Sequence, residues 1–233
     1  MKTCVIIAGG EFQTKFASSY INRTYSDFGG RPELLIAADR GIEACMKLNL
    51  VPDLILGDYD SVDPMILEQM NHAHAPESIQ FSPEKNYSDS HLAVVQAIER
   101  GASDICILGA TGCRLDHVLA NLGLLKACAD HGILAMLVDE TNRIRIVDHE
   151  CIIKRKEQHG TYVSILPYSD EVTGITLKGF QYPLNDGSLC KKEFSDIYSD
   201  MGVSRGISNI ITEERAYISV KTGYLLVIES CDR

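Results

Sequence analysis

The chain has 233 residues, 45% of them hydrophobic, which is enough for one large domain or two small ones with a substantial core. Its formal net charge is −10, which argues against a nucleic-acid-binding surface because such surfaces need basic stripes. The eight cysteines contain no C-x-x-C pair and follow no secretory signal, so we expect reduced thiols in the cytoplasm rather than a disulfide framework or a zinc site.

Residues 4–8 are apolar and predict a first strand, which turns at Gly9 and Gly10. This apolar start is too short for a signal sequence or a membrane span. No other stretch is long enough, so we expect no membrane partner. The following residues, 11–32, are polar and remain unassigned.

A second strand is predicted over residues 34–37, and an amphipathic helix over residues 42–48. Asp39 lies between them, just past the end of the strand. The common role of an aspartate at such a position is to cap the helix.

The third strand, residues 54–56, is followed by Asp58 and Asp60. Residues two apart in extended chain point to the same side, so both carboxylates project from a strand end, where open α/β sheets bind ligands. Two such carboxylates repel each other unless a proton or a cation lies between them, and Mg²⁺ prefers oxygen ligands. The pattern indicates a Mg²⁺ site; the alternative is a polar turn in which Asp60 and Ser61 cap the next helix.

A helix expected over residues 91–99 follows Ser88 and Asp89, and either residue is a suitable N-cap. The functional alternative is that Asp89 joins Asp58 and Asp60 at one cation. Lys85 would then contact a phosphate of the ligand.

Residues 105–108 predict a strand that opens into a glycine-containing loop, residues 109–114, before a helix that runs to about residue 129. Backbone N–H groups and the helix dipole make such a loop an anion site, and Arg114 adds a fork-shaped donor for phosphate. The loop is neither a P-loop nor a G-x-G-x-x-G fingerprint. We expect His117 to pack on the face of the helix.

The pattern changes after the strand predicted over residues 134–138. Up to that point strands alternate with helices, which predicts a parallel sheet flanked by helices. Beyond it, short β-branched runs are separated by predicted turns such as Asn185-Asp186-Gly187, which indicates an all-β sandwich or roll. We therefore expect an α/β domain over residues 1–147 and a β domain over residues 148–233.

Six motifs occur in the order found in one protein family, and together they span nearly the whole chain. They are Asp39-Arg40-Gly41, the stretch 57–61, the stretch 83–89, the stretch 109–117 with Asn121, the stretch 179–184 and the stretch 202–209. The chain resembles the thiamine pyrophosphokinase family.

The resemblance implies transfer of a pyrophosphoryl group from ATP to the hydroxyethyl group of thiamine, with Mg²⁺, by a homodimer. Thiamine would bind where the α/β half of one subunit meets the β half of the other. The implied metal ligands are Asp58, Asp60 and Asp89, which are also the implied catalytic residues together with Asp116. The implied ATP-binding residues are Asp39, Lys85, Ser88, Gly109, Thr111, Gly112, Arg114 and Asn121. The implied thiamine-binding residues are Thr176, Tyr182, Ser204, Ser208 and Asn209.

Three positions depart from the family's usual residues. Asn86 and Ser88 stand where Asp and Thr are common, and Cys113 stands where the loop usually has a second glycine. None of the departures removes an implied metal ligand. Two alternatives to the pyrophosphokinase remain: a nucleotide- or thiamine-binding regulatory module without turnover, and an ATP-dependent kinase or a hydrolase with a different acceptor.

Overall fold

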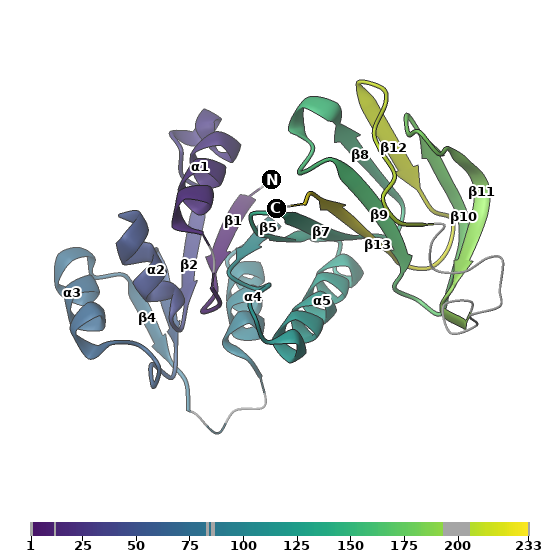
Figure 1. Ribbon diagram of the computed structural model, residues 1–233. Helices are drawn as coiled ribbons and strands as arrows, with labels where there is room; N and C mark the ends of the chain where they lie inside the picture. The colour runs from purple at the N-terminus through teal and green to yellow at the C-terminus, as the bar shows by residue number, and fades with distance from the viewer. Residues whose placement is uncertain (1, 12, 83, 85–86, 193–205, 233) are drawn as a thin grey trace. The chain divides into compact units, whose positions relative to one another are not determined.

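The computed structural model describes residues 2–11, 13–82, 84, 87–192 and 206–232 (Figure 1). Lys85 and Ser204, expected at the ATP and thiamine sites, lie outside the described residues. The chain forms two compact units, Met1–Glu140 and Thr141–Arg233. The division falls earlier than the boundary expected after residue 147, because strand β7 (Asn142–Val147) pairs with β13 (Leu225–Ser230) of the second unit.

A parallel sheet forms the centre of the first unit, in the order β4-β3-β2-β1-β5-β6. Its strands are β1 (Lys2–Ile7), β2 (Leu34–Ala38), β3 (Leu54–Gly57), β4 (Glu77–Gln80), β5 (Ala102–Leu108) and β6 (Leu134–Val138). The central strands are apolar throughout because helices cover both of their faces. The α/β fold predicted for this half is therefore confirmed.

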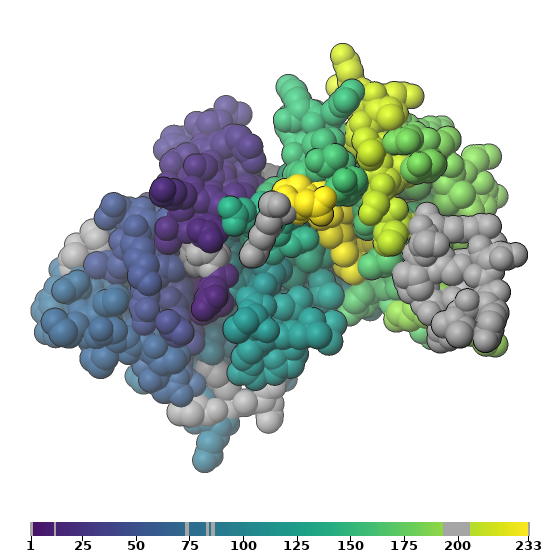
Figure 2. Space-filling model, in the orientation of Figure 1, coloured from purple at the N-terminus to yellow at the C-terminus, as the bar shows by residue number. Residues whose placement is uncertain are grey.

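The helices of the first unit form two groups. They are α1 (Thr14–Thr24), α2 (Gly41–Leu48), α3 (Pro64–His74), α4 (Asp89–Glu99) and α5 (Leu115–Asp130), with a short 3₁₀ turn at Ser26–Phe28. Helices α1, α2 and α3 share one apolar cluster with the sheet, whereas α4 and α5 pack outside that cluster, against the opposite face (Figure 1). Helices α1 and α3 reach the surface on the face that Figure 2 shows.

The second unit consists of two antiparallel sheets, β7-β13-β9 and β11-β10-β12-β8. The remaining strands are β8 (Glu150–Lys154), β9 (Tyr162–Pro167), β10 (Glu171–Lys178), β11 (Leu184–Cys190) and β12 (Arg215–Ser219), with a 3₁₀ turn at Arg155–Glu157. One apolar cluster, which includes Val163, Ile175 and Val227, joins residues of both sheets. The predicted all-β fold of this half is confirmed.

No helix in the described ranges has the length and apolar character needed to cross a membrane.

Candidate active site

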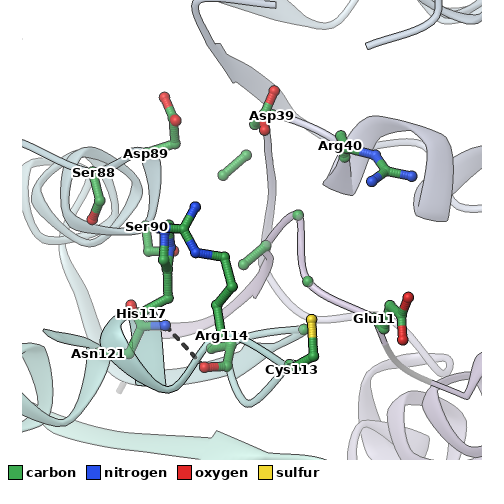
Figure 3. Close-up of a pocket in the computed structure, with 17 residues that line it drawn as sticks. Glu11, Asp39, Arg40, Ser88, Asp89, Ser90, Cys113, Arg114, His117 and Asn121 are labelled. Carbon is green, nitrogen blue, oxygen red and sulfur yellow. Dashed lines mark hydrogen bonds between the residues drawn. The ribbon is translucent and has the colours of Figure 1, made fainter. Parts of the chain in front are cut away.

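A cavity of about 360 Å³ opens at the carboxyl ends of β1, β2 and β5, beside the first residues of α4 and α5 (Figure 3). In a parallel sheet, loops that leave neighbouring strands meet at this edge and form the ligand site. The lining residues are Ala8, Gly9, Gly10, Glu11, Ala38, Asp39, Arg40, Ser88, Asp89, Ser90, Gly109, Ala110, Gly112, Cys113, Arg114, His117 and Asn121.

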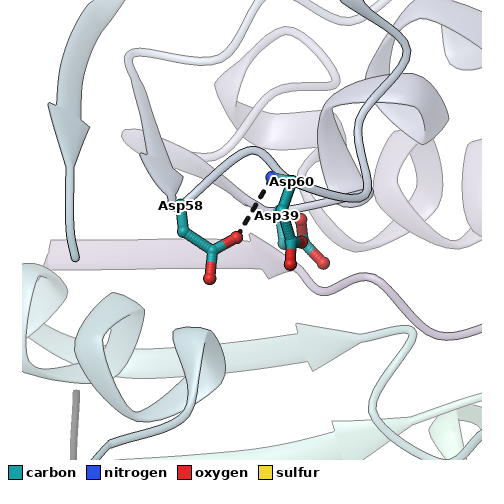
Figure 4. A group of neighbouring side chains, drawn as sticks. All are labelled: Asp39, Asp58 and Asp60. Atoms are coloured by element: carbon teal, nitrogen blue, oxygen red, sulfur yellow. Dashed lines mark hydrogen bonds between the residues drawn. The ribbon is translucent and has the colours of Figure 1, made fainter. Parts of the chain in front are cut away.

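Three carboxylates form an acidic group beside this cavity (Figure 4). One oxygen atom from each of Asp39, Asp58 and Asp60 lies within 4.8 Å of the other two. The sequence predicted that Asp58 and Asp60 lie together; the third member of this group is Asp39. Three hard oxygen donors at this spacing have the chemistry that Mg²⁺ requires.

Tyr59 determines which way its two acidic neighbours point. Its backbone is left-handed, with a φ of 63°, and its ring packs against the apolar cluster of the first unit. Its hydroxyl donates to the Ile55 carbonyl (3.2 Å) and lies 3.0 Å from Ser78 Oγ. Because the ring is held inside, Asp58 and Asp60 lie on the outer side of the loop, where the Asp60 N–H donates to Asp58 Oδ1 (3.2 Å).

Asp39 is half-buried and tightly framed. Its φ is 50°, its N–H donates to the Leu56 carbonyl (2.8 Å), and Ser61 Oγ lies 2.8 Å from both of its carboxylate oxygens. Burial raises the pKa of Asp39, and the charges of Asp89 and Asp58 act in the same direction, while the Ser61 hydrogen bond opposes them. A cation close to the Asp39 carboxylate would therefore be favourable, because it would offset the negative charges of Asp39, Asp58 and Asp89.

Ser88 and Asp89 begin α4. Ser88 Oγ accepts from the His91 N–H (3.2 Å), so the capping role considered for Ser88 is observed. Both residues also line the cavity, where Asp89 lies near Asp39 (Figure 3). Asp89 is not part of the three-carboxylate group, but its charge acts on Asp39.

Glycines allow the loop after β5 to approach the loop after β1. The Gly10 N–H donates to the Gly109 carbonyl (3.0 Å), and Gly109 has a φ of 70°. A Cβ atom on Gly10 would lie 2.3 Å from that carbonyl oxygen, so only glycine fits there. The backbone of both loops can therefore lie close to a ligand.

Two side chains hold the loop at residues 109–114 in place. Asn121, which is buried, donates from Nδ2 to the Ala110 carbonyl (2.9 Å). Thr111 Oγ1 lies 2.5 Å from Asp139 Oδ2, at the end of β6. Thr111 and Asn121 were expected at the ATP site, and here each has a bond that fixes the loop; Asp139 is a residue that the sequence did not single out.

Arg114 and Asp116 form an exposed pair at the start of α5. Arg114 donates from Nη2 to Asp116 Oδ2 (2.6 Å) and from Nε to Asp116 Oδ1 (3.2 Å). This hydrogen bonding lowers the pKa of Asp116. Arg114 lines the cavity and remains a fork-shaped donor for an anionic group, while Asp116 orients it.

Several cavity residues were not predicted to be there. They are Glu11, Arg40, Ser90, Cys113 and His117. His117 was expected to pack on the helix face. Arg40, Ser90 and Cys113 adjoin residues that the sequence did single out, so proximity in the chain was the available signal.

The thiamine-binding residues expected in the second unit occupy two places. Tyr182 is 64% exposed and is hydrogen-bonded through its backbone to the side chain of Asn209. Ser208 is exposed beside Asn209, with a φ of 59°. Thr176 lies elsewhere, in a recess of about 340 Å³ whose lining includes Tyr217.

Comparison with known proteins decides the family. Residues 29–142 match the model of the thiamin pyrophosphokinase catalytic domain, and residues 149–225 match that of the thiamin pyrophosphokinase vitamin B1 binding domain. The chain belongs to the thiamine pyrophosphokinase family.

Individual relatives agree with this membership. The chain is 29% identical to the thiamine pyrophosphokinase of Bacillus subtilis (strain 168), over 100% of both chains. It resembles the crystal structure of thiamine pyrophosphokinase from Bacillus subtilis with a TM-score of 0.81 and 28% identity, covering 100% of both chains. The thiamin pyrophosphokinase from Geobacillus thermodenitrificans gives a TM-score of 0.79 and 25% identity, over 99% of this chain and 98% of that one.

Proposed function

We propose that this protein is a thiamine pyrophosphokinase, which transfers the pyrophosphoryl group of ATP to the hydroxyl of thiamine and releases AMP. The observation that carries the proposal is the acidic group of Asp39, Asp58 and Asp60 beside the glycine loops of the cavity, in a chain that matches both domains of the family. A binding module without turnover would not need this group.

Asp58, Asp60 and Asp89 are the proposed ligands of Mg²⁺, and Asp39 adds a carboxylate within reach of the first two. The ion, when bound, would neutralise and align phosphate oxygens. The acidic group fits such an ion, because Asp39, Asp58 and Asp60 otherwise repel one another at this edge of the sheet. Ser61 and Tyr59 hold the carboxylates ready for the ion, so little rearrangement would accompany its binding.

The ATP phosphates would lie against the loop at residues 109–114 and the first turn of α5, where backbone N–H groups face an anion. Arg114 would offset phosphate charge, which matters in a chain with a net charge of −10. Asp116, with its pKa lowered by Arg114, is a weak proton acceptor. Asp116 and Asp89 are the two candidates to receive the thiamine hydroxyl proton; Asp89, which lines the cavity, would serve only when its carboxylate is not a Mg²⁺ ligand, because a bound cation weakens it as a base.

Thiamine would stack on Tyr182, since a cationic thiazolium and a flat aminopyrimidine both bind to an aromatic face. Ser204, Ser208, Asn209 and Thr176 are the further residues proposed for the thiamine site. We propose a homodimer in which the acceptor pocket joins the first unit of one subunit to the second unit of its partner. Eight free cysteines are consistent with the reducing cytoplasm as its location.

The test is the identity of the products formed from MgATP and thiamine. Thiamine labelled with ¹⁸O at its hydroxyl should give thiamine diphosphate that keeps the label in the carbon–oxygen–phosphorus bridge, together with unlabelled AMP. ADP with thiamine monophosphate would indicate a kinase of another type. Binding of both ligands without any product would indicate a regulatory module.

A further inference from the structure

The side chain of Asn209 is occupied by the backbone of Tyr182. Its Oδ1 accepts from the Tyr182 N–H (3.0 Å), and its Nδ2 donates to the Tyr182 carbonyl (2.8 Å). Oδ1 also accepts from the N–H of Ile210 (2.9 Å). An amide oxygen has two acceptor positions and an amide nitrogen has two donor hydrogens, so three of the four are already engaged.

Asn209 also links the two sheets of the second unit. Its backbone exchanges hydrogen bonds with Val163 of β9, at 3.0 and 2.8 Å, while its side chain holds Tyr182, which follows β10 of the other sheet. The neighbouring Gln181 N–H donates to the Ile210 carbonyl (2.8 Å), so the same contact continues along the chain. Asn209 is only 9% exposed and cannot change its bonds without disturbing this junction.

Tyr182 has the opposite character, because its backbone is fixed and its ring is in solvent. Tyr182 is 64% exposed as a whole residue, and in the described contacts its hydroxyl oxygen accepts a hydrogen bond only from the adjacent Gln181 (3.4 Å). A large aromatic ring in solvent gains nothing from burial in the free protein. A fixed backbone beneath it reduces the entropy that the ring and its loop would lose when a flat ligand stacks on it.

We propose that Asn209 is a positioning residue that promotes thiamine binding through Tyr182 rather than by contacting thiamine. The inference rests on the proposed function and deepens it. The ring of Tyr182 supplies the contact with thiamine, and the side-chain amide of Asn209 holds the Tyr182 backbone from which that ring projects. Asn209→Asp keeps both acceptor bonds but replaces the donor to the Tyr182 carbonyl by an oxygen that repels it, and so tests the role with a small change of shape.

The experiment is a double-mutant cycle of Tyr182→Ala and Asn209→Asp, with thiamine binding measured by calorimetry and KM measured for both substrates. Tyr182→Ala should weaken thiamine binding by about tenfold, the loss expected for one cation–aromatic contact. Asn209→Asp should weaken it several-fold, leave the KM for ATP unchanged, and add nothing in the Tyr182→Ala background. Asn142→Asp, the same replacement in β7 of the same unit, is the control and should leave both KM values unchanged.

Independent, additive losses in the double variant would overturn the proposal, because they would mean that Asn209 contacts thiamine directly. If Asn209→Asp fails to fold, a structure of the wild-type protein with bound thiamine shows directly whether Asn209 bonds to Tyr182 or to thiamine. The Asn209 amide should remain bonded to Tyr182, and a hydrogen bond from that amide to thiamine would contradict the inference. Absence of thiamine binding by the wild type would overturn the proposed function itself, and this role with it.

Discussion

The hydroxyl oxygen of Ser61 lies 2.8 Å from both carboxylate oxygens of Asp39, so a hydrogen bond from the loop after β3 fixes the position of a carboxylate in the loop after β2. Hydrogen bonds to charged groups contribute about 1.5–3 kcal/mol when they are shielded from water, and less here because Ser61 is exposed while Asp39 is half-buried. The bond stabilises the ionised form of Asp39 against the burial that raises its pKa.

Replacement of Ser61 by Ala should therefore reduce kcat/KM by up to about tenfold and raise the Mg²⁺ concentration needed for half-maximal rate. Ser61→Thr keeps the hydroxyl and should retain most of the activity. Titration of the initial rate with Mg²⁺, together with direct Mn²⁺ binding by electron paramagnetic resonance, measures the effect. Equal Mn²⁺ affinity in the wild type and in Ser61→Ala would contradict this role.

Asp58→Asn and Asp60→Asn remove charge at nearly constant shape. Each should lower kcat by at least about a hundredfold, because stabilisation of the transferring group depends on the metal that these carboxylates hold. The melting temperature should not fall, since each change relieves repulsion within the acidic group. Wild-type turnover in both variants would remove the acidic group from the mechanism.

Asp63 provides a matched control close by in the sequence. It caps α3 by accepting from the Met65 N–H (2.8 Å), and Asn caps helices about as well as Asp. Asp63→Asn should therefore keep both stability and activity, despite losing the same charge as Asp60→Asn. A comparable loss of rate in Asp63→Asn would mean that general electrostatics, rather than a metal site, explains the effect.

The hydrogen bond between Thr111 and Asp139 predicts an effect on the KM for ATP but not on the KM for thiamine. Thr111→Val keeps the shape and removes the hydroxyl that bonds Asp139, so the loop at residues 109–114 should lose part of its order. The KM for ATP should rise by about three- to tenfold, while the KM for thiamine stays unchanged. Thr173→Val, which removes a comparable hydroxyl pair with Thr222 in the second unit, should leave the KM for ATP as it is.

Local patterns were sufficient for most of the first unit. The strand over residues 54–56 and the two carboxylates after it could be predicted because burial and strand ends leave signals in adjacent residues. Asp39 was singled out, but its place in the acidic group was not predicted. That place depends on a left-handed backbone and on a hydroxyl 22 positions away, which are tertiary features.

Two elements, α1 and part of β11, could not be predicted because their residue types favour other structures. Helix α1 (Thr14–Thr24) lies in the stretch left unassigned; it has a mean hydropathy below zero and no side-chain cap, yet Tyr20 and Ile21 are buried. Asn185-Asp186-Gly187 predicted a turn but lies inside β11, where the pairing shifts register and Asp186 has a φ of 53°. Tertiary packing overrode local preference at both places.

Glu229 is fully buried and carries the strongest electrostatic prediction for stability. It pairs with Arg143 (2.6 Å) and Arg145 (2.5 Å), and it accepts from the His159 N–H (2.9 Å). Burial alone would raise the pKa of Glu229, but the two guanidinium groups and the backbone N–H together hold it below its usual value of 4.5. Removing one member of a buried ionic group typically costs about 3–5 kcal/mol, because the remaining charges stay buried without a partner.

Glu229→Gln should therefore lower the free energy of unfolding by about 3–5 kcal/mol at pH 7, measured by urea denaturation. A carboxylate with a lowered folded-state pKa stabilises the fold above its unfolded-state pKa, and this stability is lost as the pH falls through the folded-state value. The difference in the free energy of unfolding between wild type and variant should thus stay constant from pH 7 to about pH 5 and shrink below pH 4.5, the usual pKa of a glutamate.

Glu157→Gln is the control. Glu157 is exposed and has lysine partners, so this replacement should lower the free energy of unfolding by less than about 1 kcal/mol. A difference between the wild type and Glu229→Gln that does not change down to pH 3 would show that lost packing, and not the charge of Glu229, accounts for the destabilisation.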